Sequence, residues 1–242
     1  MAKKPGRPVK EQVKTPKKVK NAFIGIENES CLHRVLKYRY VGPGGKTEVT
    51  VGEFVADGIN KGGEYIEVQT GSFGPLKKKV KEFAALGKVL IIHPIAVTKK
   101  IEVYEPDGSL LYRRKSPVHG SLWNIFDALL YAPELPLIRN VSIEIVLVDI
   151  TEKRVRDGKG NRKGISKKDK SLTAWHESLL LKKPSDYLRF VPFKKNEEFT
   201  ASQLAESAQV DKDTARMALY VLTKMKVVKR IGKKKTAWLY TR

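Results

Sequence analysis

The sequence of 242 residues has a single cysteine, Cys31, and four widely spaced histidines. One cysteine excludes an internal disulfide and a cysteine-rich zinc site, and histidines without a close pair or an HExxH motif indicate structural or exposed roles. The chain also lacks a phosphate-binding loop of the GxxxxGK[ST] type and a nucleophile elbow. These absences argue against an ATPase, a hydrolase triad and a redox enzyme.

Long hydrophobic runs are absent as well. No stretch of about 18 apolar residues occurs, so the chain is not expected to span a membrane. The basic N-terminus lacks the apolar core of a secretory signal. We therefore expect a protein of a reducing compartment, the cytoplasm, associated with the nucleoid.

Acidic residues are scarce relative to basic ones: 26 Asp and Glu stand against 48 Lys and Arg, a formal net charge of +22. So large an excess predicts a polyanionic partner. The excess is concentrated in residues 1–20, 153–170 and 212–242, which carry +7, +7 and +9, while the rest of the chain is close to neutral. We therefore expect a globular core with three basic extensions that bind a phosphate backbone.

The first two extensions have little apolar patterning. Residues 1–20 are predicted to be a disordered basic arm, in which Lys4-Pro5-Gly6-Arg7-Pro8 resembles the Gly-Arg-Pro centre of a minor-groove AT-hook; a generic basic arm is the alternative. Residues 153–195 are predicted to be a basic loop, up to residue 170, and a linker of helical pieces around Pro184. The loop is either a solvated surface or, as we favour, a flexible clamp on phosphates. Its candidate contacts are Lys159, Arg162, Lys163, Lys167 and Lys168.

Residues 21–152 alternate between helical and strand patterns and predict an α/β core with a mixed-sheet sandwich. The first helix, over 28–38, has an apolar stripe of Leu32, Val35 and Leu36, and Glu29 falls on that stripe. The alternative for Glu29 is an acid in the first helical turn, favoured by the helix dipole. The further elements expected are strands at 46–51, 52–57, 64–70, 89–92 and 141–150, helices at 74–86 and 121–131, and a hairpin over 99–115 with its turn at Pro106-Asp107-Gly108.

Residues 196–242 form the most clearly patterned module. Thr200-Ala201-Ser202-Gln203 is a capping-box pattern at the start of a helix, a short turn and a second helix follow, and a basic hairpin ends the chain. This order resembles a winged helix-turn-helix, whose second helix enters the major groove of DNA. A protein-interaction module is the alternative. The residues expected to contact DNA are Lys212, Arg216, Lys233, Lys234 and Lys235.

Two carboxylates on a predicted hairpin are the candidate chemical site. Asp57 ends one strand pattern, and after a turn containing Gly58, Gly62 and Gly63 a second strand carries Glu67 and Gln69 on one face. Two carboxylates on paired strands are the oxygen ligands that Mg²⁺ takes with few protein donors. Each has a simpler interpretation, Asp57 as a turn residue and Glu67 as a solvent-facing side chain. Their joint spacing in so basic a chain predicts phosphodiester cleavage.

This pattern, over about residues 22–95, resembles the PD-(D/E)XK nuclease superfamily, the fold of restriction endonucleases and Holliday junction resolvases. The resemblance implies that Asp57, Glu67 and the Val68 carbonyl bind Mg²⁺ or Mn²⁺, with Glu29 as a supplementary acid. The family usually has Lys where this chain has Gln69, so a cation could instead come from Lys77, Lys78 or Lys79 on the next helix, of which Lys77 is taken as the catalytic candidate.

The resulting hypothesis is a metal-dependent endonuclease that acts on double-stranded DNA and is targeted by its winged helix. A homodimer is considered because cutting both strands usually requires two active sites. The alternative is a non-catalytic DNA-binding regulator with a degenerate nuclease-like core. An RNA-processing role is a third option, which the winged helix disfavours.

Overall fold

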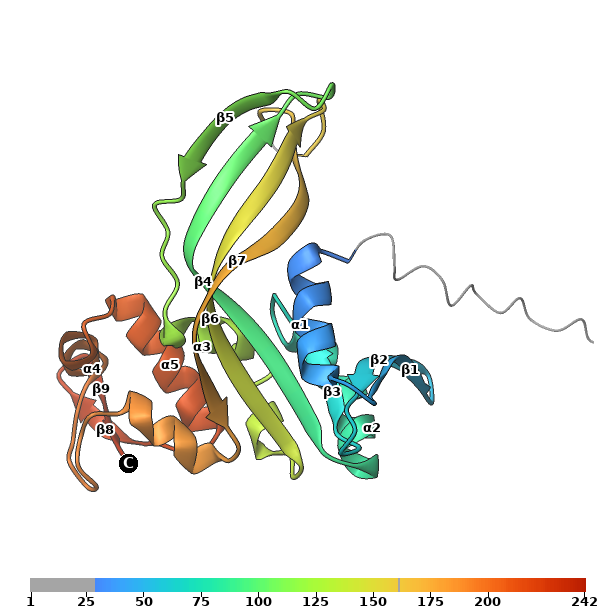
Figure 1. Ribbon diagram of the computed structural model, residues 1–242. Coiled ribbons are helices and arrows are strands. Elements are labelled where there is room, and N and C mark those ends of the chain that lie inside the picture. The colour runs from blue at the N-terminus through green and yellow to red at the C-terminus, as the bar shows by residue number, and fades with distance from the viewer. Residues whose placement is uncertain (1–28, 161) are drawn as a thin grey trace, which may run out of the picture.

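The computed structural model describes residues 29–160 and 162–242, so Arg7 and the AT-hook-like segment lie outside the described residues. A seven-stranded mixed sheet forms the centre of the molecule, with strand order β1-β2-β3-β4-β6-β7 and with β5 paired to β4 (Figure 1). Helices cover both faces of this sheet. The predicted α/β class with a mixed sheet is therefore confirmed.

The sheet combines antiparallel edges with a parallel centre. β1 and β2, β2 and β3, β4 and β5, and β6 and β7 are antiparallel pairs, whereas β4 is parallel to both β3 and β6. The centre of β4 begins with Val89–Ile92, whose continuous apolar run suits a strand covered on both faces. The strands are β1 (Lys46–Val51), β2 (Phe54–Ile59), β3 (Tyr65–Val68), β4 (Val89–Tyr104), β5 (Leu110–Lys115), β6 (Val141–Arg156) and β7 (Ile165–Leu181).

Two apolar clusters lie on opposite faces of the sheet. On one face, Leu32 and Leu36 of α1 (Cys31–Val41) pack against Ile66, Val68 and Ile92. On the other, the side chains of α2 (Lys77–Leu86), α3 (Ile125–Leu129) and the C-terminal elements form one larger cluster. Short 3-10 helices are η2 (Gly74–Leu76), η3 (Leu122–Asn124), η4 (Leu135–Leu137) and η5 (Pro184–Phe190). None of the described helices is both long and apolar enough to cross a bilayer.

Helix α1 begins later than its sequence pattern predicts. Ser30 is the N-cap, and its hydroxyl accepts a hydrogen bond from the backbone N–H of His33. Glu29 therefore precedes the helix, and both its placement on the helical stripe and its alternative as a first-turn acid are wrong. Val35 is exposed whereas Lys37 is buried, so the helix turns a charged residue inward.

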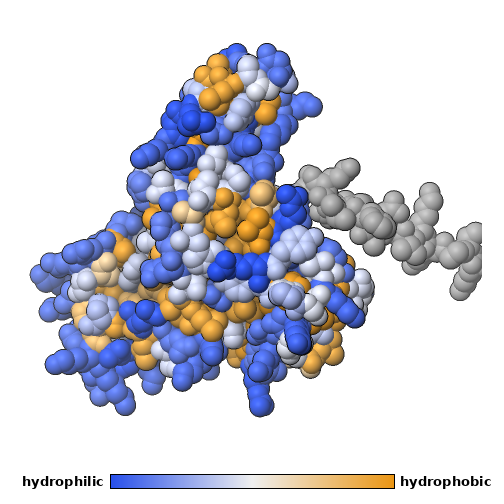
Figure 2. All heavy atoms as spheres, viewed as in Figure 1, coloured by the Kyte–Doolittle hydropathy of each residue, from blue (hydrophilic) through white to orange (hydrophobic). Residues whose placement is uncertain are grey.

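The predicted basic loop at 153–170 is wrong, and the helical pieces predicted from 171 are wrong up to Leu181, where β7 ends, but a helical piece is present at Pro184–Phe190. β6 continues to Arg156 and returns as β7 from Ile165, and the two strands pair along almost their whole length. Together with β5 and the end of β4 they form a projecting arm, residues 99–115 and 150–172 (Figure 1). Hydrophilic side chains cover most of this arm on the face seen in Figure 2. Only the 3-10 helix η5 remains of the predicted linker.

The C-terminal elements follow the predicted order. Thr200 and Gln203 form the capping box of α4 (Ala201–Ala208), and α5 (Lys212–Lys224) starts at the N-cap Asp211. The hairpin of β8 (Lys229–Lys234) and β9 (Ala237–Thr241) follows, with a bridge between Phe199 and Tyr240. Their buried side chains belong to the same cluster as α2 and α3, so this module is packed onto the main body.

Because the C-terminal module and the main body share one apolar cluster, we expect the two parts to unfold together in a single transition. Phe199 is fully buried and its ring stacks on Phe193 with centroids 4.2 Å apart. Phe199→Ala should lower the free energy of unfolding by about 3–5 kcal/mol. Urea denaturation followed by circular dichroism and tryptophan fluorescence would measure this loss. The control, Leu86→Ala at an exposed position, should change stability by less than about 0.5 kcal/mol. Two separate transitions would contradict the shared core.

Candidate functional site

Asp57 and Glu67 lie where strands β2 and β3 separate. The last paired positions are Gly58 and Ile66, and Asp57 and Glu67 are the next residues on the two strands. The Asp57 carboxylate accepts a hydrogen bond of 2.7 Å from the N–H of Val68, and the Glu67 carboxylate accepts one of 3.2 Å from the N–H of Asp57. The two side chains thus replace backbone hydrogen bonds that the diverging strands no longer make.

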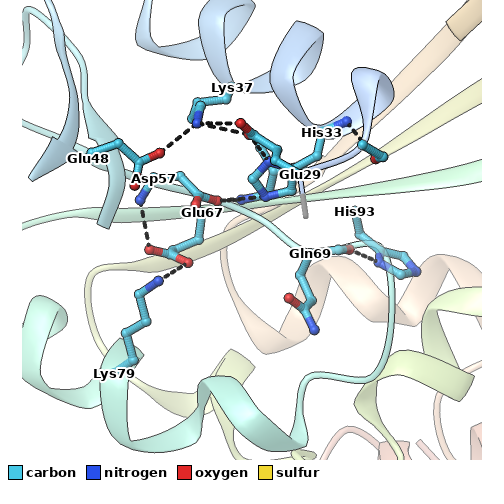
Figure 3. A network of polar contacts seen from close by, with 11 residues as sticks. Glu29, His33, Lys37, Glu48, Asp57, Glu67, Gln69, Lys79 and His93 are labelled. Carbon is cyan, nitrogen blue, oxygen red and sulfur yellow. Dashed lines mark hydrogen bonds and ion pairs between the residues drawn. The ribbon is translucent and has the colours of Figure 1, made fainter. Parts of the chain in front are cut away.

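The two carboxylates meet cations from opposite layers of the fold (Figure 3). Asp57 faces His33 of α1, with Oδ2 3.2 Å from Nε2, and Glu67 accepts a hydrogen bond of 2.7 Å from Lys79 of α2. Only 2% of Glu67 is exposed. Burial and the negative charge of Asp57 raise the pKa of Glu67 to about 7, although Lys79 opposes this shift. The negative charges of Asp57 and Glu67 therefore repel each other.

His33 joins Asp57 to a second group of carboxylates. Its Nδ1 contacts Glu29, so each ring nitrogen meets a carboxylate oxygen and the imidazolium can donate to both. Burial alone would lower the pKa of His33, but the hydrogen bonds and charges of Asp57 and Glu29 outweigh burial and raise it. Lys37 completes the network, with Nζ 2.8 Å from Glu29 and 2.6 Å from Glu48.

Burial and nearby cations also have opposite effects on the pKa values of Asp57 and Glu29, the two acids that contact His33. Burial would raise the pKa of Asp57, but His33 and the Val68 N–H lower it overall. Burial would likewise raise the pKa of Glu29, but Lys37 and His33 hold it below its usual value. Near neutral pH both acids are ionised, and they can act as anionic ligands.

A cavity of about 480 Å³ opens onto this network. Glu29, Glu48 and Asp57 line one side, together with His33. Strand β7 supplies the other side, where Lys167, Lys168 and Lys170 lie. The N–H of Cys31, at the start of α1, donates to Asp169 of β7 at 2.8 Å and ties these two walls together. The β7 side is therefore mainly basic, although Asp169 also lines it and the Nζ of Lys168 is paired with Asp157, 2.9 Å away.

The structure brings together some of the predicted site residues and separates others. Asp57 and Glu67 are neighbours, with Val68 held beside them, but Glu67 does not line the cavity. Gln69 turns away, and its amide donates to the carbonyl of Ser72 at 2.7 Å. Lys77 points elsewhere, with its Nζ 2.7 Å from Glu134, whereas Lys79, another of the three lysines considered, contacts Glu67 at 2.7 Å.

The predicted nucleic-acid contacts divide between two sides of the sheet. Lys167 and Lys168 line the cavity, whereas Lys159, Arg162 and Lys163 are exposed near the tip of the arm. Lys212, Arg216, Lys233, Lys234 and Lys235 are exposed on the C-terminal module, which packs on the face opposite α1 (Figure 1). Arg216 is paired with Asp213 at 2.9 Å. One flat surface does not contain all of these side chains.

Sequence patterns did not predict the roles of His33, Lys37 or Lys170. The spacing of Glu29, His33 and Lys37, four residues apart each time, could have placed them on one side of a chain turning into a helix. Lys79 was among the three lysines that the sequence offered, and its position did not distinguish it from Lys77. Lys170 reaches the cavity only because β7 pairs with β6.

Within residues 29–160 and 162–242, no group of three or more His, Cys, Asp or Glu side chains is placed to hold a metal ion. Asp57 and Glu67 offer a pair of hard oxygen donors, as Mg²⁺ requires when it retains several waters. A cation would also relieve the repulsion that raises the pKa of Glu67. Asp57 and Glu67 would therefore hold such an ion by two carboxylate oxygens, with water as its remaining ligands.

Residues 30–182, from the N-cap of α1 to the end of β7, match the family model described as "Domain of unknown function (DUF8091)". A protein of Treponema pallidum (strain Nichols), described as an uncharacterized protein, is 30% identical over 137 residues. The match covers 57% of this chain and 55% of the Treponema protein, so the chain spans about half of that relative. No solved structure matches significantly.

The raised pKa of Glu67 predicts a pH dependence of stability. A folded pKa of about 7, above the ordinary value of 4.5, means that the protonated form stabilises the fold and that this contribution is lost as the pH rises through 7. In Glu67→Gln, the fall in the free energy of unfolding between pH 5 and 8 should be smaller by roughly 1–3 kcal/mol. Denaturant titrations across this range would measure it. Glu53→Gln, at an exposed position, is the control; an equal fall in all three proteins would contradict the prediction.

Proposed function

The chain belongs to the family described as domain of unknown function DUF8091, and we propose that it is a metal-dependent DNA endonuclease. The observation that carries this proposal is the cavity with Asp57, Glu29 and Glu48 on one side and lysines of β7 on the other. Carboxylates suit a divalent cation, and lysines suit the phosphates on either side of the bond to be cut.

The fold that we propose with this activity is a restriction endonuclease-like core followed by a winged helix. Support for the core comes from the order of α1, the antiparallel strands β1–β3, α2 and the parallel strand β4, with the carboxylates at the point where β2 and β3 diverge. Support for the winged helix comes from α4, α5 and the basic hairpin β8–β9.

In this proposal, Asp57 and Glu67 hold Mg²⁺ or Mn²⁺, with the Val68 carbonyl as a further candidate ligand. The metal, when bound, would polarise the phosphate and lower the pKa of its attacking water. Lys79 is the cation nearest the pair and takes the place proposed for Lys77. His33 and Glu29 hold the Asp57 carboxylate in position, and Lys167 and Lys168 bind the flanking phosphates.

A second candidate, a DNA-binding protein without catalytic activity, is favoured by one set of contacts. Asp57 and Glu67 each have a backbone donor and a cationic partner, so the pair is satisfied without a metal. In this proposal the carboxylates stabilise the diverging strands, and the lysines of β7 and of the C-terminal module bind the phosphate backbone. Double-stranded DNA is the proposed partner in both cases, and a homodimer is proposed only for the nuclease.

We expect purified protein to nick supercoiled plasmid DNA in the presence of Mg²⁺ or Mn²⁺. Asp57→Asn and Glu67→Gln keep the size of each side chain and should reduce nicking by about 100-fold or more, the scale of several kcal/mol of lost transition-state stabilisation. Glu64→Gln, on the same hairpin and outside the cavity, is the matched control. Nicking at the wild-type rate in both site variants would refute the nuclease proposal; DNA binding without any nicking would favour the non-catalytic protein.

Salt dependence identifies which lysines bind phosphates. Removal of one lysine that neutralises a phosphate should reduce the slope of log affinity against log salt by about 0.9. The double variant Lys167→Gln, Lys168→Gln and the triple variant Lys233→Gln, Lys234→Gln, Lys235→Gln should therefore reduce the slope by about 2 and about 3. Fluorescence anisotropy with a labelled duplex measures it, with exposed Lys88→Gln as control. An unchanged slope in the triple variant would exclude the hairpin β8–β9 from the DNA interface.

A further inference from the structure

A second cavity lies beside the first, in a notch at the edge of β4. Strand β3 pairs with β4 up to Ile92, and β5 pairs with it from Lys100, so neither strand covers residues 93–99. The chain that leaves β3 at Thr70–Ser72 forms one wall of the notch, and the chain that follows β5 at Val118–Gly120 forms another. Asn124 and Asp127, near and on α3, close a cavity of about 300 Å³.

His93 presents a hydrogen-bond acceptor to this cavity. Its Nδ1 donates to the carbonyl of Gln69 at 2.6 Å, which leaves the lone pair on Nε2 (Figure 3). The ring is 6% exposed, meets Phe73 edge-on and lines the cavity. Among the described residues, the ring nitrogen with a hydrogen-bond partner is Nδ1, and Nε2 is not one of the fully buried side-chain atoms that lack a partner, so solvent or a ligand can reach it. Burial lowers the pKa of His93, so the neutral ring persists at neutral pH. Nε2 can therefore accept a hydrogen bond from a ligand that enters the cavity.

The notch and the carboxylate cavity are two ends of one groove. A small cavity of about 140 Å³ lies between them and shares Thr70 and Lys170 with the carboxylate cavity. It also shares Thr70, Pro94, Ala96 and Lys99 with the His93 cavity. We call these three adjoining cavities the groove; their lining runs from Asp57 over Thr70 to His93, and the middle cavity is lined by Lys99 and Lys170 and also by Glu152.

The chemistry of the His93 cavity matches one component of a nucleotide. Nε2 of His93 and the carboxylate of Asp127 are acceptors, and Pro94, Ile95 and Val118 supply apolar walls. Adenine, guanine and cytosine offer exocyclic amino donors and flat apolar faces. Lys99 and Lys170 stand between this cavity and Asp57, where the backbone phosphate attached to the base would lie.

We propose that the His93 cavity receives one base of the nucleic-acid strand whose phosphate occupies the carboxylate cavity. This inference rests on the proposed function and adds to it, because the protein would hold its substrate by an unstacked base next to the phosphate. The substrate class is then a strand with at least one extruded or unpaired base. Regular duplex DNA without such a base would be bound less tightly at this groove.

The test uses single-stranded oligonucleotides with 2-aminopurine at each position in turn, mixed with the intact protein in the absence of divalent metal. We expect one position to show a several-fold rise in fluorescence on binding, because that base leaves the stack. An abasic site at the same position should weaken binding by about tenfold, the effect of removing one bound base.

Two variants of His93 separate ligand binding from packing. Asparagine can reproduce the Nδ1–H bond to Gln69 but places no acceptor at the position of Nε2, whereas glutamine reaches that position and abandons Nδ1. His93→Asn should therefore lose the fluorescence signal and about tenfold in affinity, and His93→Gln should retain both. The reverse order would show that His93 serves only the Gln69 carbonyl, and would overturn the inference.

The outcomes also distinguish this inference from the proposed function. If the oligonucleotides bind and Asp57→Asn abolishes nicking, but no position gives a fluorescence signal, the base cavity is wrong and the nuclease proposal stands. If the wild-type protein binds none of the single-stranded oligonucleotides, the base cavity is wrong, and plasmid nicking alone decides the nuclease proposal. If a base signal appears in a protein that never nicks DNA, the cavity stands and the non-catalytic alternative replaces the nuclease.

Discussion

The parallel pairing of β4 with β6 is the interaction on which the rest of the structure depends. It runs from Val89 opposite Val141 to Tyr104 opposite Val155, with one register shift. Its first half is buried between two layers and belongs to both apolar clusters, while its second half leaves the body as the core of the arm. Because one pair of strands serves both regions, the lysines of β7 are held in a defined position beside α1 rather than on a mobile loop.

The candidate site follows from the way the sheet opens next to that pair. Where β2 and β3 separate, backbone donors would be left unpaired, and the Asp57 and Glu67 carboxylates accept them. Buried carboxylates are costly without compensation, so His33 from one layer and Lys79 from the other approach them. In the proposed nuclease, the same two carboxylates would also hold the divalent cation. Structure and proposed chemistry therefore use the same residues.

Local patterns predicted the elements that depend on local interactions. The helix at 77–86, the turn at Pro106-Asp107-Gly108 and the capping box at Thr200 are all present. The strand at 165–181 was missed because lysine, serine and aspartate have low strand propensity, and this segment is extended by its pairing with β6. Glu29 was misplaced for a similar reason: Ser30 caps the helix, and Glu29 is held outside it by His33 and Lys37.

By itself, the sequence determined the α/β class, the basic character of the chain and the proximity of Asp57 to Glu67, because propensity, charge and hairpin spacing are properties of short segments. Only the tertiary structure decided that Lys79 rather than Lys77 meets Glu67, and that Lys167 and Lys170 of β7 line the same cavity as Asp57. It also decided that the C-terminal module packs on the face opposite α1. These contacts join residues far apart in the chain, and strand pairing and core packing, rather than local preference, set such distances.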